Sequence, residues 1–132
     1  PGSYPMRRDA RETKEAYFNF AFRYKQDEFK GLPVEKFRKA LESEIGITVE
    51  ASYEPLNNCS LYVPHTKPAR HKLNDQYWQE IDPAGFSLPV CERIHTKESV
   101  CIHHKILLGN KTDMEMITEA VKKIYLHAGE IE

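Results

Sequence analysis

The chain has 132 residues, of which 40% are hydrophobic and 30% are charged, and its formal net charge is −1. This composition is typical of one folded domain and excludes a disordered chain, and the near-neutral charge gives no general attraction to nucleic acid or anionic membranes. No apolar run approaches the roughly 20 residues that cross a bilayer, so we expect a cytoplasmic protein without membrane contact. The three widely spaced cysteines, which form no C-x-x-C pair, are expected to be reduced thiols: Cys59, Cys91 and Cys101.

The first predicted element is a strand at residues 16–24 (AYFNFAFRY). Phe18, Phe20 and Phe22 recur at every second position, which predicts one face packed on a core and one face toward water. Residues 4–14 before this strand are charged and aperiodic, and they predict no regular element.

A helix is predicted for residues 32–46, where apolar side chains recur at intervals of three and four. Pro33 suits a first helical turn, and Gly46 suits the position just after the last turn. Residues 47–53 (ITVEASY) then predict a second strand. The apolar stripe of the helix consists of Val34, Phe37, Ala40, Leu41 and Ile45.

Residues 54–82 have no period and are rich in Pro and Asn, so a long loop is predicted, with a short helical turn at 73–81. A loop of this length in a compact domain is usually functional or disordered. A further helix is predicted within residues 87–98, with Ser87 as its cap. Its apolar stripe consists of Val90, Cys91 and Ile94.

The last two predicted elements are a strand at residues 100–102, which ends in His103, His104 and Lys105, and a final helix. Thr112 followed by Glu115 predicts a capping box at the start of that helix. The apolar stripe of the helix consists of Met114, Ile117, Ala120, Val121, Ile124 and Tyr125.

These elements predict an α+β fold, a two-layer domain with a small, mostly antiparallel sheet of about three strands packed against about three helices. Residues 4–132 are expected to form this single domain. Residues 1–3 (Pro-Gly-Ser) are expected to be an added leader.

The sequence contains no complete active site. It has no glycine-rich phosphate loop and no G-x-S-x-G nucleophile motif. The six histidines show no metal-ligand spacing, and His103 and His104 on a strand would point to opposite faces, so no metal site is predicted.

Polar side chains nevertheless end the third strand and fill the loop after the second, and both segments could lie along one edge of the sheet. Loops at the ends of rigid strands are common recognition sites, and these side chains suit a ligand with many hydroxyl groups. The alternative is that they contact only solvent. The residues concerned are Tyr53, Asn57, Asn58, His103, His104 and Lys105.

Three segments are informative when they are taken together in this order: residues 4–44, residues 51–62 with the motif YEPL, and residues 89–124 with the motifs PVCERI and HHKILLG. They resemble the C-terminal end of DegT/DnrJ/StrS-type aminotransferases, which aminate sugars and cyclitols. Residues 89–124 are similar to that family's P-V-A-E-R-I-like helix, short strand and last helix. Residues 51–62 (ASYEPLNNCSLY) are similar to its Y-x-P-L loop, and residues 4–44 match the preceding strand and helix. The form HHKILLG is nearest to the scyllo-inosose aminotransferase branch.

The resemblance implies a small C-terminal domain that helps to close the active site, while a missing N-terminal domain binds pyridoxal phosphate through a lysine. No catalytic, cofactor-binding or metal residue is carried over to this chain, and the cofactor is expected in the parent enzyme. His103 is expected to be structural, and the parent is expected to be a homodimer. A free-standing α+β binding module without activity is the alternative reading. The substrate-facing residues implied by the resemblance are Tyr53, Asn57, Asn58, His104 and Lys105.

Overall fold

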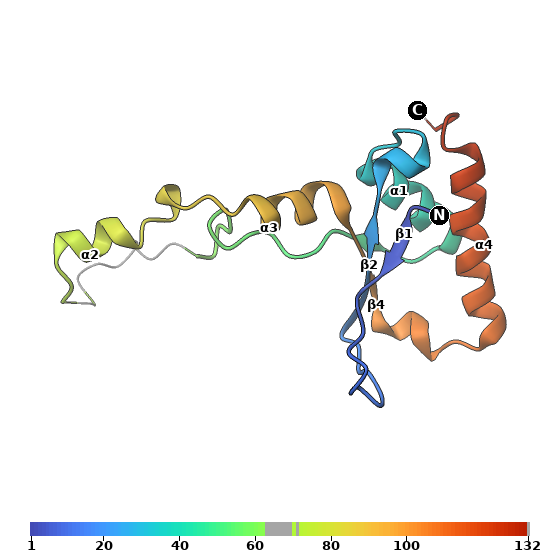
Figure 1. The fold of residues 1–132 in the computed structure, drawn as a ribbon, viewed down its shortest axis with the longest axis horizontal. Coiled ribbons are helices and arrows are strands. Elements are labelled where there is room, and N and C mark those ends of the chain that lie inside the picture. The colour runs from blue at the N-terminus through green and yellow to red at the C-terminus, as the bar shows by residue number, and fades with distance from the viewer. Residues whose placement is uncertain (63–69, 71, 132) are drawn as a thin grey trace. The chain divides into compact units, whose positions relative to one another are not determined.

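A computed structural model describes residues 1–62, 70 and 72–131. The chain divides into two compact units, the first made of Pro1–Ser52 with Thr96–Glu132 and the second of Tyr53–His95. The first unit contains a sheet with the strand order β1-β2-β4-β3, in which every neighbouring pair is antiparallel (Figure 1). The α+β prediction is therefore confirmed. The strands are β1 (Ser3–Pro5), β2 (Asn19–Tyr24), β3 (Val49–Glu50) and β4 (Ser99–His103).

The sheet has four strands rather than the predicted three, and the additional strand is β1. It was not predicted, because three residues are too few to show a period. Ser3 pairs with Tyr24, and the Gly2 N–H donates to the Glu28 carboxylate at 2.7 Å. Gly2 has a φ of 75°, and a Cβ there would lie only 2.3 Å from the Phe29 ring, so only glycine fits. Ser3, one of the residues expected to be a leader, is thus the first residue of β1, and the leader assignment itself stays a prediction. β3 is shorter than predicted.

One face of the sheet is covered by α1 (Val34–Ile45) and α4 (Lys111–His127), which also pack on each other (Figure 1). Phe22 is buried on this face as the alternation predicted, and Phe20 is partly buried. Phe18 remains 67% exposed, because β2 begins at Asn19 and Phe18 therefore lies just outside the strand. The fully buried side chains at the centre of this core are Tyr24, Phe29, Phe37, Leu41, Val100 and Ile102.

Tyr24 joins the core to the segment before α1. Its ring lies 4.7 Å from that of Phe29 and 4.6 Å from that of Phe37, measured between centroids. Its hydroxyl donates to the Leu32 carbonyl at 2.6 Å. Burial raises the pKa of the Tyr24 hydroxyl, since a phenolate would lose its hydration there.

The helix α1 confirms the predicted stripe, with Val34, Phe37 and Leu41 buried. Gly46 ends the helix in the left-handed conformation, with a φ of 66°, and its N–H donates to the Glu42 carbonyl at 2.9 Å. Glycine is the residue that adopts this conformation without strain.

The stripe of α4 is also confirmed, but its predicted cap is wrong. The helix begins after Asn110, whose side chain accepts from the N–H groups of Thr112 and Asp113. The Asp113 carboxylate in turn accepts from the Asn110 N–H at 2.8 Å. An Asn–Asp pair therefore forms the capping box, two residues before the Thr112–Glu115 pair.

The second unit contains α2 (Asp75–Glu80), the single turn η4 (Pro83–Gly85) and α3 (Pro89–Arg93). The π-helical turn η5 (Ile94–Glu98) follows α3 in the chain, and its last three residues belong to the first unit. The helical turn predicted at 73–81 is confirmed by α2. Ser87 does not cap α3, because Leu88 is the residue before its first turn. Of the residues described in this unit, only Pro55 is buried. Within the described ranges, no helix is both long and apolar enough to cross a bilayer.

Candidate functional site

The two histidines at the end of β4 lie side by side, which corrects the expectation that they point to opposite faces. The strand ends at His103, and His104 already begins the 3-10 helix η6 (His104–Leu108), so the alternation of the strand stops between them. Their ring centroids are 4.2 Å apart and the rings are tilted by 35°. The structure therefore brings both imidazoles to one place on the first unit.

His104 is held by the carbonyl of Phe18, which lies next to the start of β2. The backbone N–H of His104 donates to this oxygen at 3.3 Å, and the ring Nδ1 lies 2.8 Å from the same oxygen. A carbonyl oxygen can only accept, so Nδ1 must carry the hydrogen. In the neutral ring, Nε2 of His104 is then a hydrogen-bond acceptor.

His103 has the opposite arrangement. Its Nδ1 lies 3.3 Å from the backbone nitrogen of Lys105, and a backbone N–H can only donate, so Nδ1 is the acceptor. The neutral ring therefore carries its hydrogen on Nε2. The Nδ1 contact also caps the first turn of η6, whereas the expectation that His103 is structural because it faces away from His104 loses its basis, since the rings lie side by side.

The ring of Phe18 completes this cluster, with its centroid 6.2 Å from that of each histidine. In the part of the chain that the structure describes, no three side chains of the metal-binding types lie together, so the histidine pair gains no further ligand. An exposed aromatic ring beside two imidazoles is instead suited to an uncharged organic ligand.

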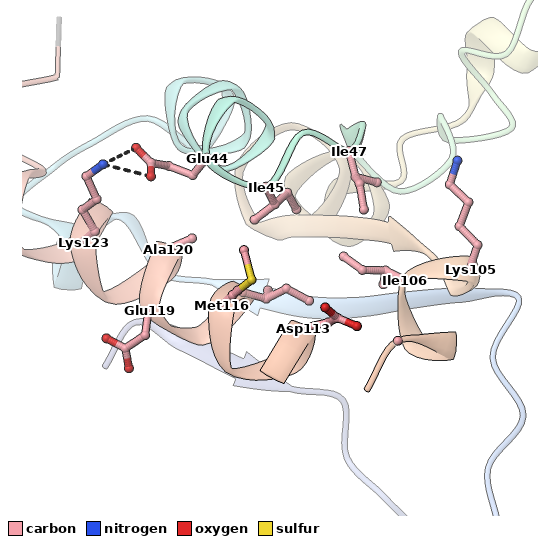
Figure 2. Close-up of a pocket in the computed structure, with 12 residues that line it drawn as sticks. Glu44, Ile45, Ile47, Lys105, Ile106, Asp113, Met116, Glu119, Ala120 and Lys123 are labelled. Carbon is pink, nitrogen blue, oxygen red and sulfur yellow. Dashed lines mark hydrogen bonds and ion pairs between the residues drawn. The ribbon is translucent and has the colours of Figure 1, made fainter. Parts of the chain in front are cut away.

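A pocket of about 650 Å³ lies between the end of α1, η6 and α4, all within the first unit. Its volume is in the range of small-molecule sites. Figure 2 shows Lys105 at one end of the pocket and the Glu44–Lys123 ion pair, at 2.7 Å, at the other. The sequence did not reveal this pocket, because the end of α1 is far in the chain from η6 and α4, which form the other walls. Its apolar lining consists of Ile45, Ile47, Ile106, Met116, Ile117 and Ala120.

Most charges at the rim of this pocket already have partners. Asp113 is engaged by the cap of α4, and Lys123 is engaged by Glu44. Lys105 is exposed, and no described carboxylate lies within ion-pair distance of its Nζ. Lys105 is therefore an exposed cation next to His104 in the chain, and its role as a substrate-facing residue stays a prediction.

The other predicted site residues belong to the second unit. Tyr53 is 80% exposed, and Asn58 lies in a turn in which its N–H donates to the Pro55 carbonyl at 2.9 Å. The Asn57 amide donates to the Phe86 carbonyl at 3.1 Å, while its Oδ1 is buried and lacks a hydrogen-bond partner among the described residues. The meeting of these residues with His104 and Lys105 at one site stays a prediction.

Comparison with known proteins gives relatives that match nearly the whole chain. The chain is 37% identical over 130 residues to an L-glutamine:2-deoxy-scyllo-inosose aminotransferase of Streptoalloteichus tenebrarius, and the match covers 98% of this chain and 30% of that protein. The enzyme of the same description from Streptomyces kanamyceticus is 36% identical over 126 residues, which are 96% of this chain and 29% of the relative. An L-glutamine:scyllo-inosose aminotransferase of Streptomyces griseus is 29% identical over 119 residues, which are 90% of this chain and 28% of that relative.

The resemblance to the scyllo-inosose aminotransferase branch is therefore confirmed, and the chain is homologous to one part of these enzymes. It spans about 30% of the length of the first of these relatives. No family model matches the chain.

Proposed function

We propose that this chain is the small C-terminal domain of a larger pyridoxal-phosphate-dependent aminotransferase that aminates an inosose-type cyclitol ketone with L-glutamine as donor. The observation that carries this proposal is the similarity of 98% of the chain to an enzyme described by that reaction. Because the match covers 30% of the relative, the remaining part of the parent would supply the catalytic machinery.

The second unit supports a larger parent, because it has almost no core of its own. Many of its large apolar side chains are exposed, and Pro55 is the single buried residue among those described. A segment that buries so little apolar surface does not offset its loss of conformational entropy by itself. We assign the missing N-terminal, cofactor-binding domain as the surface that covers it, which disfavours a free-standing module. The most exposed of these side chains are Tyr53, Leu56, Leu61 and Val90.

Pyridoxal phosphate supplies the electron sink that amino-group transfer needs, and it is held through a lysine. The described residues of this chain do not fit that role. Each lysine in the described ranges is exposed, whereas an amine that forms a Schiff base near neutral pH is usually desolvated or placed beside another cation. Of the two lysines at the pocket, Lys123 is engaged by Glu44. We therefore place the cofactor on the missing domain.

This chain's contribution is then to the substrate. His104 presents an acceptor at Nε2, and Lys105 presents a cation without a described partner. Hydroxyl groups and phosphate oxygens are the ligand groups that such side chains bind. We infer that both residues line the cleft of the parent, together with Tyr53, Asn57 and Asn58.

The proposal is tested by expressing the complete natural reading frame that contains this chain and recording its visible spectrum with pyridoxal phosphate. We expect a bound-cofactor band, which borohydride fixes onto a lysine outside residues 1–132. Fixation onto a lysine of this chain, or no binding by the complete protein, would overturn the assignment. Light scattering on the same sample tests the homodimer that we infer for the parent, and a monomer would contradict it.

A further inference from the structure

The histidine pair carries one donor and one acceptor on neighbouring rings. In each ring Nδ1 is engaged within the fold, by the Phe18 carbonyl in His104 and by the Lys105 N–H in His103. Each Nε2 is left without a hydrogen-bond partner among the described residues. Because the two Nδ1 atoms have opposite roles, the neutral His103 offers an N–H and the neutral His104 offers a lone pair.

The rings are close enough for one small ligand to contact both, since their centroids are 4.2 Å apart. A hydroxyl group both donates and accepts, so two neighbouring hydroxyls can accept from one imidazole and donate to the other. The exposed ring of Phe18, 6.2 Å from each histidine, offers an apolar face to the C–H groups of the same ligand. A metal ion or an anion would not use a donor and an acceptor together in this way.

We propose that His103 and His104 together bind two neighbouring hydroxyl groups of a cyclitol substrate, with the Nε2–H of His103 donating to one oxygen and Nε2 of His104 accepting from the next. This inference rests on the proposed function and adds to it the ligand chemistry that the pair selects. His103 is thus a substrate-binding residue as well as the cap of η6.

The two roles of each histidine can be separated by substitution with asparagine. In His103→Asn, the side-chain oxygen can accept from the Lys105 N–H and keep the cap, while the Nε2–H is lost. In His104→Asn, the side-chain amide can donate to the Phe18 carbonyl, while the Nε2 acceptor is lost. Both variants should therefore keep the fold, which thermal unfolding checks. His127→Asn is the matched control, because the His127 ring is hydrogen-bonded at the surface to Glu130, near the end of α4 and away from the histidine pair in the chain.

In the complete aminotransferase, each asparagine variant should raise the KM for the inosose acceptor by about three- to tenfold, the effect of one lost hydrogen bond. The KM for L-glutamine should stay within about twofold, because the donor lacks neighbouring hydroxyls. Unchanged acceptor KM values in both variants of an active enzyme would overturn the histidine proposal and leave the aminotransferase proposal intact.

A binding measurement keeps the inference testable without turnover. In the complete protein labelled with ¹⁵N-histidine, scyllo-inositol should shift the Nε2 signals of His103 and His104, and cyclohexanol should not. The same spectra should show the hydrogen on Nδ1 of His104 and on Nε2 of His103 in the neutral rings. Equal shifts with both compounds, no shift with scyllo-inositol, or the reverse tautomers would overturn it.

Discussion

The Glu28 carboxylate accepts hydrogen bonds from the Gly2 N–H and from the Tyr4 hydroxyl, each at 2.7 Å. Lys25 Nζ lies 3.1 Å from the same carboxylate. The contacts of Gly2 and Tyr4 thus connect β1 and the residue before it to the turn after β2, while the Lys25 contact lies within that turn. The Tyr4 hydroxyl and then Lys25 hold the pKa of Glu28 below its usual value.

Removal of this carboxylate should loosen β1 and leave the rest of the sheet in place. In Glu28→Ala, we expect faster hydrogen exchange of the β1 amides and unchanged exchange in β4, measured by NMR. Glu15→Ala is the control, since Glu15 contacts the Tyr17 hydroxyl at the surface at 2.6 Å. Equal protection of β1 in Glu28→Ala and the unmodified protein would contradict this role.

The hydrogen bond from Tyr24 to Leu32 should be visible in the free energy of unfolding. Tyr24→Phe leaves the buried Leu32 carbonyl without this donor, and we expect a loss of about 1–2 kcal/mol in urea unfolding. Tyr17→Phe removes a hydroxyl whose partner is on the surface, and it should change stability by less than about 0.5 kcal/mol. Equal effects of the two substitutions would contradict the difference in burial.

Tyr24 also predicts a loss of stability in alkali. Its pKa is raised in the folded protein by burial, so the unfolded state loses the proton first as the pH rises. The contribution of the protonated Tyr24 hydroxyl to the free energy of unfolding is fully present below the unfolded-state pKa of about 10, and it is lost as the pH rises above that value. Unfolding measured between about pH 9 and 11 should therefore show a smaller decline for Tyr24→Phe than for the unmodified protein. Parallel declines would contradict this prediction.

The observed cap of α4 makes a prediction that differs from the one based on the sequence pattern. Asn110→Ala should lower the free energy of unfolding by about 1 kcal/mol, because two N–H groups of the first turn lose their acceptor. Thr112→Ala should change it by less than about 0.5 kcal/mol, because Thr112 lies inside the helix. The reverse order of the two effects would favour a cap at Thr112.

Long periodic segments were predictable, as was the end of α1 at Gly46, but the start of α4 was not. The stripes of α1 and α4 match the buried residues, because burial of one helix face requires that spacing. The cap of α4 was misplaced because Asn110–Asp113 and Thr112–Glu115 both fit a capping pattern, and only the chain path chooses between them. The strand β1 carries no pattern, since Gly2 and Glu28 hold it through contacts across 26 positions in the chain.

The geometry of the candidate site also depends on where an element ends. His103 and His104 were identified as unusual from the sequence, but their relation depends on where β4 ends. One further residue of strand would send the rings to opposite faces, and one turn of η6 brings them to 4.2 Å. The pocket beside Lys105 was not predictable, because α1, η6 and α4 meet there only in the folded chain.

The measurement that tests the central claim most directly is the amination of 2-deoxy-scyllo-inosose by the complete natural protein, with L-glutamine and pyridoxal phosphate present. We expect formation of the amino-cyclitol in proportion to the glutamine consumed, and no product from residues 1–132 alone. A complete protein that binds the cofactor but aminates neither this ketone nor scyllo-inosose would contradict the proposed substrate class. Amination by residues 1–132 alone would contradict the assignment of the chemistry to the rest of the protein.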